Sequence, residues 1–252
     1  MLSEKAIKVT VWGENIHERR DPQVAAIYPL GMHTTIAEAI SERLGLLSDV
    51  RTTTLDSPDS GLSHELLQNT DVLVWWGHLA HDAVPDHLVD EVVERIWRGM
   101  GLVMLHSGHL SKIFRKLMGT SCNLRWRSSG DRETVWTVDP SHPIAKEVPE
   151  VFVIEAQEMY GEHFDIPAPE ELVFISSFLG GEVFRSGCCF RRGRGRIFYF
   201  SPGDQEYPVY HHPEVRKVIA NAVAWAHPEG GVRPEPYRTE HRESGWYVEG
   251  RP

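Results

Sequence analysis

The sequence predicts an α/β protein in which helices cover both faces of a mostly parallel sheet. Residues 71–77 (DVLVWWG) and 101–105 (GLVML) contain short apolar runs, as expected for strands that are buried on both faces. Segments with apolar residues at helical spacing alternate with these runs in the first half of the chain. This alternation indicates parallel strands that are joined by helical crossovers.

The first half divides into short elements and one long connection. Residues 14–31 are polar and contain two prolines, and we expect them to form a long loop of the kind that is often functional. A helix begins at Met32, and Gly45 is its expected C-cap. The other expected elements are strands at 6–13, 50–55, 71–77 and 101–105, a turn at 56–61, and an amphipathic helix at 87–99.

The second half is richer in turn residues. The RRGR sequence between two apolar runs indicates a C-terminal β-hairpin that is formed by residues 181–190 and 195–203. We expect one domain over residues 1–227 and a polar tail over residues 228–252. The remaining expected elements are strands at 133–138, 151–155 and 172–178, a polar, aromatic loop at 157–171, and a closing helix at Pro213–Ala226.

The composition is that of a soluble globular protein. Of the 252 residues, 41% are hydrophobic and 25% are charged, and the formal net charge of −10 argues against a nucleic-acid partner. The first residues lack a signal-peptide pattern, and no run reaches the roughly 20 apolar residues of a membrane span. Three cysteines, two of them adjacent, are typical of a reduced protein. We therefore expect a cytoplasmic protein without membrane partners.

Polar side chains gather where the predicted strands end. Ligands of an open α/β sheet bind beyond the carboxyl ends of its strands, which makes these side chains candidates for a site. At Gly101–His109 a buried strand passes through a tight glycine turn into a helix, as in elbow motifs that present nucleophiles. The expected residues at four strand ends are Glu14, Asn15, His17, Glu18, His78, His81, His106, Ser107, His109, Ser201, Asp204 and Glu206.

Two histidine pairs have a spacing that suits zinc. His78 and His81, like His106 and His109, are three residues apart, which places two imidazoles about one helical turn apart. We predict a divalent metal site, zinc by preference, that is formed by His78, His106 and His109. The spacing matches no strong signature such as HExxH, so a solvated loop stays the alternative for several of these histidines. Further candidate ligands are Glu14, Glu158 and His163.

Covalent and nucleotide chemistry have weaker support. Ser107 as a nucleophile needs a base within hydrogen-bond reach, and adjacency to histidines does not ensure that geometry. The sequence contains no Walker loop, and its GxG-like stretch, RRGRGR, lies in the wrong context for dinucleotide binding. We expect no nucleotide cofactor.

Aromatic residues accompany the polar groups and indicate a sugar ligand. A sugar stacks its C–H face on an aromatic ring while its hydroxyls form hydrogen bonds. Trp126, Tyr160 and Tyr207 are expected in loops, and they suit this role better than Trp75, which is expected in the core.

Six long motifs extend over about residues 6–227: YPLGMHTTIAEAI, DVLVWWGHLAH, LVMLHSGHLSKIF, EMYGEHFDIP, EVFRSGCCFRRGRGRIFYFSPG and HHPEVRKVIANAVAWA. Together they resemble the trehalose-utilisation, ThuA-like family. The resemblance implies the fold of class I glutamine amidotransferases, which is a flavodoxin-like doubly wound sheet. It also implies a role in handling trehalose or related disaccharides, including their keto forms.

The amidotransferase relationship implies what has changed at the elbow. His106 of LHSG stands where those enzymes have a cysteine nucleophile, and Ser201 and Gly203 of FSPG replace their acid–base pair. The HHPE sequence at 211–214 opens the closing helix and is a false match to the missing motif. Glutamine amidotransferase activity is therefore not expected, and fold likeness alone assigns no reaction.

These observations lead to a prediction of function. We expect an enzyme that acts on a sugar or keto-sugar in a histidine-rich cleft, with His106 and Glu158 as catalytic acid–base or metal-binding groups. The alternative is a non-catalytic sugar-binding or regulatory protein on the same fold, and either form could be a homo-oligomer. The expected substrate-binding residues are Glu14, His17, Ser107, Tyr160, Arg185 and Asp204.

Overall fold

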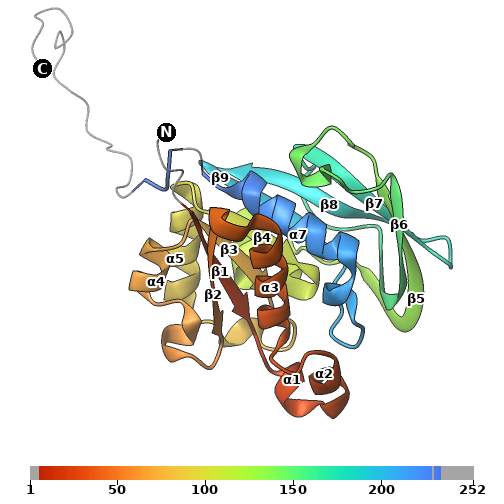
Figure 1. Ribbon diagram of the computed structural model, residues 1–252, viewed down its shortest axis with the longest axis horizontal. Coiled ribbons are helices and arrows are strands. Elements are labelled where there is room, and N and C mark those ends of the chain that lie inside the picture. The colour runs from red at the N-terminus through yellow and green to blue at the C-terminus, as the bar shows by residue number, and fades with distance from the viewer. Residues whose placement is uncertain (1–5, 229, 234–252) are drawn as a thin grey trace, which may run out of the picture.

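The computed structural model describes residues 6–228 and 230–233, and these residues form an α/β fold around a large sheet (Figure 1). Within them, nine strands pair in the order β2-β1-β3-β4-β9-β8-β7-β5-β6. The first five strands of this order are parallel, and their arrangement is the flavodoxin-like 2-1-3-4-5 order. These strands are β2 (Ser48–Thr54), β1 (Ile7–Gly13), β3 (Val72–Trp76), β4 (Gly101–Leu105) and β9 (Gly195–Phe200).

The other four strands form an antiparallel extension of the same sheet, which we call the wing. The expectation of a mostly parallel sheet is therefore wrong, because half of the strand pairings are antiparallel. Parallel neighbours are joined by crossovers that usually contain an α-helix, whereas no α-helix lies between consecutive strands from β5 to β9. The predicted hairpin of β8 and β9 is confirmed. The wing strands are β8 (Val183–Arg192), β7 (Glu171–Phe178), β5 (Arg125–Thr137) and β6 (Val151–Gly161).

Helices cover both faces of the parallel half, and two hydrophobic cores result. Val103 and Leu105 of β4 pack in one core, and Leu102 and Met104 pack in the other, because successive side chains of a strand point to opposite faces. This explains why the strand sequences are apolar throughout. The first core contains side chains of α3 (Met32–Leu44) and α7 (Pro213–Ala226), and the second contains side chains of α4 (His64–Gln68), α5 (Asp86–Trp97) and α6 (Lys112–Met118).

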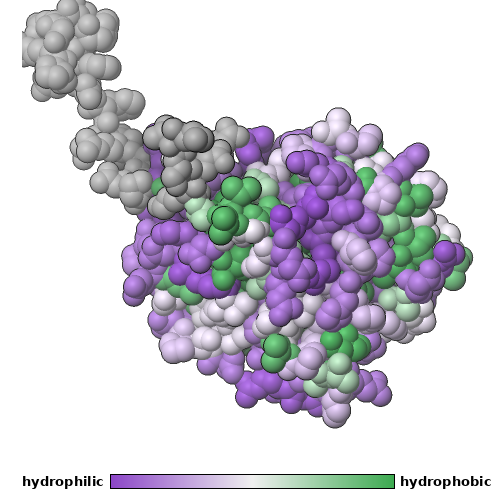
Figure 2. Space-filling model, in the orientation of Figure 1, coloured by the Kyte–Doolittle hydropathy of each residue, from purple (hydrophilic) through white to green (hydrophobic). Residues whose placement is uncertain are grey.

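The outer surface differs between the two halves (Figure 2). Over α3 and α7 the visible face is hydrophilic, and ion pairs such as Arg216–Glu42 at 2.6 Å link helices there. Over the wing, hydrophobic side chains reach the surface, including Trp136 and Val183.

The connection at 14–31 is more ordered than the sequence indicated. It contains two short helices, α1 (His17–Arg20) and α2 (Pro22–Ile27). The Asp21 side chain accepts a hydrogen bond from the backbone N–H of Gln23, and Pro22 fits the first helical position. The prediction of a loop over residues 14–31 is therefore wrong. Short 3₁₀ turns also occur at Gly45–Leu47, Pro58–Gly61, His81–Ala83, His106–Leu110, Pro143–Ala145 and Val209–His211.

Strands β5 and β6 are longer than the predicted strands at 133–138 and 151–155. They continue to Arg125 and Gly161, so that Trp126 and Tyr160 face each other across the two strands instead of lying in loops. Polar residues and shifts of register interrupt the alternation of apolar residues in these extensions, which removes the usual sequence signal of a strand.

The helix after β4 begins later than expected. A 3₁₀ turn at His106–Leu110 follows the strand, and α6 begins at Lys112 after Ser111, whose hydroxyl accepts a hydrogen bond from the N–H of Phe114. His109 therefore does not start a helix. The predicted helices at Met32–Leu44 and Pro213–Ala226 are confirmed, with Gly45 as the C-cap of the first.

Three further features concern the predicted properties of the chain. Cys122, Cys188 and Cys189 are buried and free of disulfides, and burial raises the pKa of Cys122 to about 11 and that of Cys188 to about 12. Among the described residues, no helix has the length and apolar character needed to cross a bilayer. Most of the predicted tail lies outside the described residues, and the single-domain boundary stays a prediction.

Candidate functional site

A cavity of about 290 Å³ lies beyond the carboxyl ends of the parallel strands, where the wing meets them. Ligands of doubly wound sheets bind in this position. Six of the residues predicted for the site line it: His78, Ser107, His109, Glu158, Tyr160 and Asp204.

His106 lies at the tip of the turn after β4, with an unusual backbone and almost complete burial. Its φ of 45° is in the left-handed region, as the elbow interpretation expects, and its exposed fraction is 1%. Nδ1 donates a hydrogen bond to the carbonyl oxygen of Ser201 at 2.8 Å. A Cβ at Gly203 would lie 3.1 Å from the Cβ of His106 and would collide with Tyr210. The FSPG segment therefore lies beside His106, as the amidotransferase relationship implied.

The other ring nitrogen of His106 faces two carboxyl groups. Its Nε2 lies 3.3 Å from Oε2 of Glu158 and 4.0 Å from Oδ2 of Asp204. The ring of Tyr160 stacks on the imidazole at 4.7 Å, and its hydroxyl is 3.2 Å from Nε2. Glu158 and Tyr160 come from β6, so the wing completes a site that begins on the parallel strands.

Burial and neighbouring charges set the protonation states of His106, Glu158 and Asp204. Burial disfavours a charged imidazole, but the hydrogen bond to Glu158 and the charge of Asp204 raise the pKa of His106 above its ordinary value. Burial likewise disfavours an ionised Glu158, but its bond to His106 lowers the pKa of Glu158. For Asp204 burial prevails and raises the pKa. The arrangement thus holds an imidazolium–carboxylate pair beside a carboxyl group that keeps its proton more readily.

His78 belongs to a second histidine pair at the cavity wall. Its Nδ1 lies 2.8 Å from Nε2 of His17, and the two rings stack at 4.9 Å. Burial lowers the pKa of both imidazoles, that of His17 to about 4, so the pair is neutral near pH 7. His17 does not line the cavity. It fixes the orientation of His78.

Glu14 supports the loop that carries His78. Its two carboxylate oxygens accept hydrogen bonds from the backbone N–H groups of His78, Leu79 and Ala80 at 2.8 to 2.9 Å. The side chain is 2% exposed and does not line the cavity. The predicted contact of Glu14 with substrate is therefore not what this geometry provides, because the carboxylate is already occupied by backbone donors.

Ser107 and His109 line the cavity but are tied to the protein. The Ser107 hydroxyl donates a hydrogen bond to the carbonyl oxygen of Gly77 at 2.9 Å. Nδ1 of His109 donates to the carbonyl oxygen of Cys122 at 2.7 Å, and burial lowers the pKa of His109 to about 3. His109 is therefore a neutral part of the wall.

Arg185 lies away from the cavity lining. Its guanidinium forms an ion pair with Glu162 at 2.8 Å and donates to the carbonyl oxygen of Phe164 at 2.7 Å. Its Nε and Nη2 are used inside the protein and it does not line the cavity, so the predicted role of Arg185 in substrate binding stays a prediction.

The residues placed to hold a metal ion differ from those predicted. Among the described residues, the group at metal-binding distance is His106, Glu158 and Asp204, whose ligand atoms lie within 4.8 Å of one another. Ligand bonds of about 2.1 Å at tetrahedral angles separate ligand atoms by about 3.4 Å, close to the observed separations. His78 and His109 are not in this group. The turn aims His106 at Glu158, whereas His109 is turned toward Cys122.

Gln205 is a cavity residue that sequence analysis missed. It is 5% exposed, and its Oε1 has no hydrogen-bond partner within the described residues. A buried acceptor without a partner costs free energy unless a ligand or water supplies a donor. The available signal was its position directly after Asp204, beyond the end of β9.

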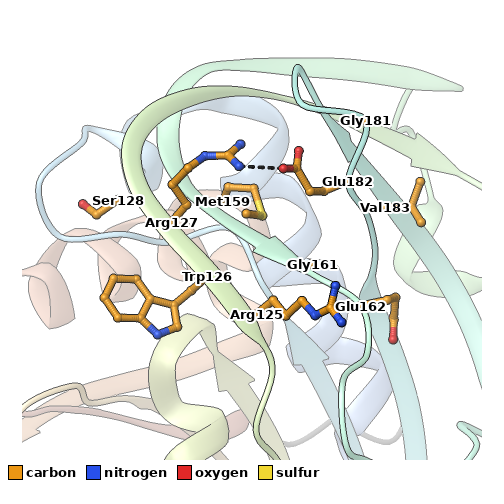
Figure 3. A pocket seen from close by; sticks show the side chains of 10 residues that line it. All are labelled: Arg125, Trp126, Arg127, Ser128, Met159, Gly161, Glu162, Gly181, Glu182 and Val183. Carbon is orange, nitrogen blue, oxygen red and sulfur yellow. Dashed lines mark hydrogen bonds and ion pairs between the residues drawn. The ribbon is translucent and has the colours of Figure 1, made fainter.

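A larger hollow of about 780 Å³ lies beside β5, and Trp126 and Ser128 line it as well as the first cavity (Figure 3). Arg125 and Arg127 point to the side of Glu182, whereas Trp126 and Ser128 point away from it (Figure 3). Arg127 is paired there with Glu182 at 2.6 Å. The smaller cavity is the better candidate site, because it gathers ionisable groups that face one another.

Comparisons with solved structures concern the fold. A ThuA-like protein from Parabacteroides merdae is 16% identical, with a TM-score of 0.64 over 92% of this chain and 93% of its own. A ThuA-like protein from Bacteroides uniformis is 18% identical, with a TM-score of 0.62 over 90% and 96%. A glutamine amidotransferase from Thermotoga maritima is 13% identical, with a TM-score of 0.50 over 87% and 97%. These likenesses confirm the fold that the resemblance implied.

The family of this chain follows from the comparison of its sequence with protein-family models. None of the curated proteins with which it was compared matches it. The ThuA family model, described as trehalose utilisation, matches residues 8–226. Because this match spans most of the chain, the protein belongs to the ThuA family.

Proposed function

We propose that the protein transforms a sugar or keto-sugar, such as an oxidised disaccharide, in the cavity at His106. The observation that carries the proposal is the approach of His106, Glu158 and Asp204 to one another in a cavity with an aromatic wall. The unpartnered Oε1 of Gln205 offers an acceptor to a hydroxyl group. The description of the family as trehalose utilisation agrees with this ligand class.

The geometry suits proton transfer on a carbonyl compound. A C–H bond beside the carbonyl of a keto-sugar is acidic, and a carboxylate within reach removes such a proton efficiently. Glu158 is the base in this scheme, because His106 stabilises its ionised form. Asp204 donates its proton to the carbonyl oxygen as Glu158 removes the proton from carbon, which forms an enediol. Glu158 then returns its proton to the former carbonyl carbon while Asp204 takes one from the neighbouring hydroxyl, so that both groups are restored and the sugar is isomerised. Glutamine amidotransferase activity is not part of the proposal, because His106 replaces the nucleophile.

Binding of a divalent metal ion, zinc by preference, is the alternative role of the same three side chains, because a carboxylate that ligates an ion is not a free base. His106, Glu158 and Asp204 would hold it, and a bound ion would supply a Lewis acid that polarises a carbonyl or hydroxyl oxygen. One equivalent of zinc per chain in protein purified without chelators, lost in His106→Ala, supports this part. Its absence from wild-type protein in zinc-containing buffer contradicts it.

Activity of the Glu158 variant tests the reaction. Wild type, Glu158→Gln and Glu155→Gln are incubated with trehalose and its keto form, with and without divalent metals, and products are detected by mass spectrometry. We expect Glu158→Gln to lose about 10²- to 10⁴-fold in turnover. Glu155 is exposed on the same strand and forms an ion pair with Arg132 at 3.5 Å, so Glu155→Gln serves as the matched control.

Binding without chemistry would favour the alternative function. If no product forms with any metal while wild type and His106→Ala bind the same sugar equally well, the protein is a sugar-binding or regulatory protein and His106 is not an essential contact. The cytoplasmic location and a homo-oligomeric state stay predictions.

A further inference from the structure

The size of the cavity limits what it can enclose. Pockets that bury most of a small organic ligand have volumes of about 300 to 1,000 Å³. At about 290 Å³, the cavity beside His106 is at the lower end of this range. This volume accommodates one sugar ring, and a second ring that extends from it would reach the mouth of the cavity.

An exposed indole stands at that mouth. Trp126 lines the cavity and is 65% exposed. It lies directly across from Tyr160 in the pairing of β5 with β6, and Tyr160 stacks on His106. Cross-strand neighbours share one face of a sheet. Tyr160, with His106 stacked behind it, and the exposed Trp126 therefore line the same side of the cavity.

No contact within the described part of the chain accounts for the exposure of this side chain. Trp136 on the same strand is also exposed, at 45%, but its indole N–H donates a hydrogen bond to the hydroxyl of Ser177 at 3.2 Å. The indole N–H of Trp126 forms no hydrogen bond to the other described residues. Water contact with a large apolar ring is unfavourable, and a stacked ligand removes it.

The rim around Trp126 is polar. Asn123, Ser128 and Glu206 line the same cavity and are exposed. Their side chains form no hydrogen bond or ion pair with the described part of the chain. Free amide, hydroxyl and carboxyl groups beside an aromatic face are the donors and acceptors that sugar hydroxyls need.

We propose that Trp126 is the platform of a second sugar subsite, so that the protein recognises a two-ring saccharide with one ring beside His106 and the other stacked on Trp126. The inference rests on the proposed function, because it names the substrate class of the same cavity. Trp126 determines specificity and takes no part in the proton transfer.

Binding measurements with one-ring and two-ring sugars test the subsite. Trehalose, its keto form, glucose and keto-glucose are titrated by calorimetry into wild type, Trp126→Ala, Trp126→Phe and Trp136→Ala. We expect Trp126→Ala to weaken two-ring binding about tenfold and to change one-ring binding less than twofold. Trp126→Phe retains most of the affinity, and Trp136→Ala matches wild type.

The outcomes separate the subsite from the reaction. Equal weakening of one-ring and two-ring sugars in Trp126→Ala, or no weakening of either, overturns the subsite, while turnover by wild type keeps the proposed function. Selective loss of two-ring binding without turnover by wild type supports the subsite and contradicts the reaction. Wild-type protein that binds no sugar overturns both.

Discussion

His106 combines the backbone of a tight turn with the chemistry of an imidazole. Its φ is in the left-handed region, and its side chain reaches the segment after β9. An imidazole at this position has two nitrogens, and the carbonyl of Ser201 occupies the first. The second nitrogen is thereby directed at Glu158 and Asp204, where it can act as a proton carrier or ligand.

Glu133 is a buried carboxyl group whose ionisation opposes folding. It is fully buried on β5, and neither of its oxygens has a hydrogen-bond partner within the described residues. Burial raises the pKa of Glu133 to about 7, above the ordinary value of 4.5. Because the folded state disfavours the ionised form, stability falls as the pH rises from 4.5 through 7.

Glu133→Gln removes this pH dependence. We expect the free energy of unfolding of the variant to exceed that of wild type by about 3 kcal/mol at pH 8 and to approach it at pH 4.5. Urea unfolding at the two pH values measures the difference, and Glu65→Gln, at an exposed position of α4, is the control. A difference that is the same at both pH values contradicts the assignment.

At the scale of elements, Glu14 connects the end of β1 to the loop after β3. Hydrogen bonds to a carboxylate are stronger than those to a neutral amide, and Gln offers one acceptor oxygen in place of two. We expect Glu14→Gln to speed hydrogen exchange of the amides of residues 78–80 about tenfold. Mass spectrometry of exchanged peptides measures this, with Glu65→Gln as the control. Unchanged exchange at 78–80 would show that other contacts hold the loop.

The parallel half of the fold could be predicted because the pattern of apolar residues within each strand or helix shows which of its faces are buried. Strands buried on both faces are apolar throughout, and helices such as Pro213–Ala226 carry one apolar face, so their limits agree with the expected ones. The wing could not be predicted in the same way. Its strands continue through polar residues and register shifts, and their pairing depends on partners distant in sequence.

The same distinction applies to the site. Position after a strand indicated His78, His106, Ser107 and Asp204, and all but His106 line the cavity while His106 lies directly behind it. Glu14 and Arg185 have side chains that could bind a sugar. The sequence does not show that backbone N–H groups bind the carboxylate of Glu14, or that Glu162 forms an ion pair with Arg185. Residue type suggests what a side chain can bind, and only the fold shows what it binds already.

At the scale of the whole molecule, buried neutral histidines set the acid limit of stability. Burial lowers the pKa of His109 to about 3, whereas an unfolded histidine titrates near 6.5. Acid therefore protonates the unfolded chain first, and stability that is fully present above pH 6.5 is lost as the pH falls toward 3. This group alone is expected to cost about 2 kcal/mol at pH 5.

His109→Phe should flatten this dependence. We expect the loss of unfolding free energy between pH 7 and pH 5 to be smaller in the variant than in wild type, whatever the effect of the substitution at pH 7. His87→Phe, at an exposed position of α5, should leave the slope unchanged. Parallel pH profiles for His109→Phe and wild type would assign the acid sensitivity to other groups.

The deep burial of all three cysteines makes this protein convenient to label. Because Cys122, Cys188 and Cys189 are buried and burial raises the pKa of each thiol, maleimide reagents react with them slowly in the folded state. A cysteine introduced at the cavity mouth, as in Ser128→Cys, becomes the reactive thiol without removal of the native ones. A fluorophore attached there would report the entry of a ligand beside Trp126 in real time.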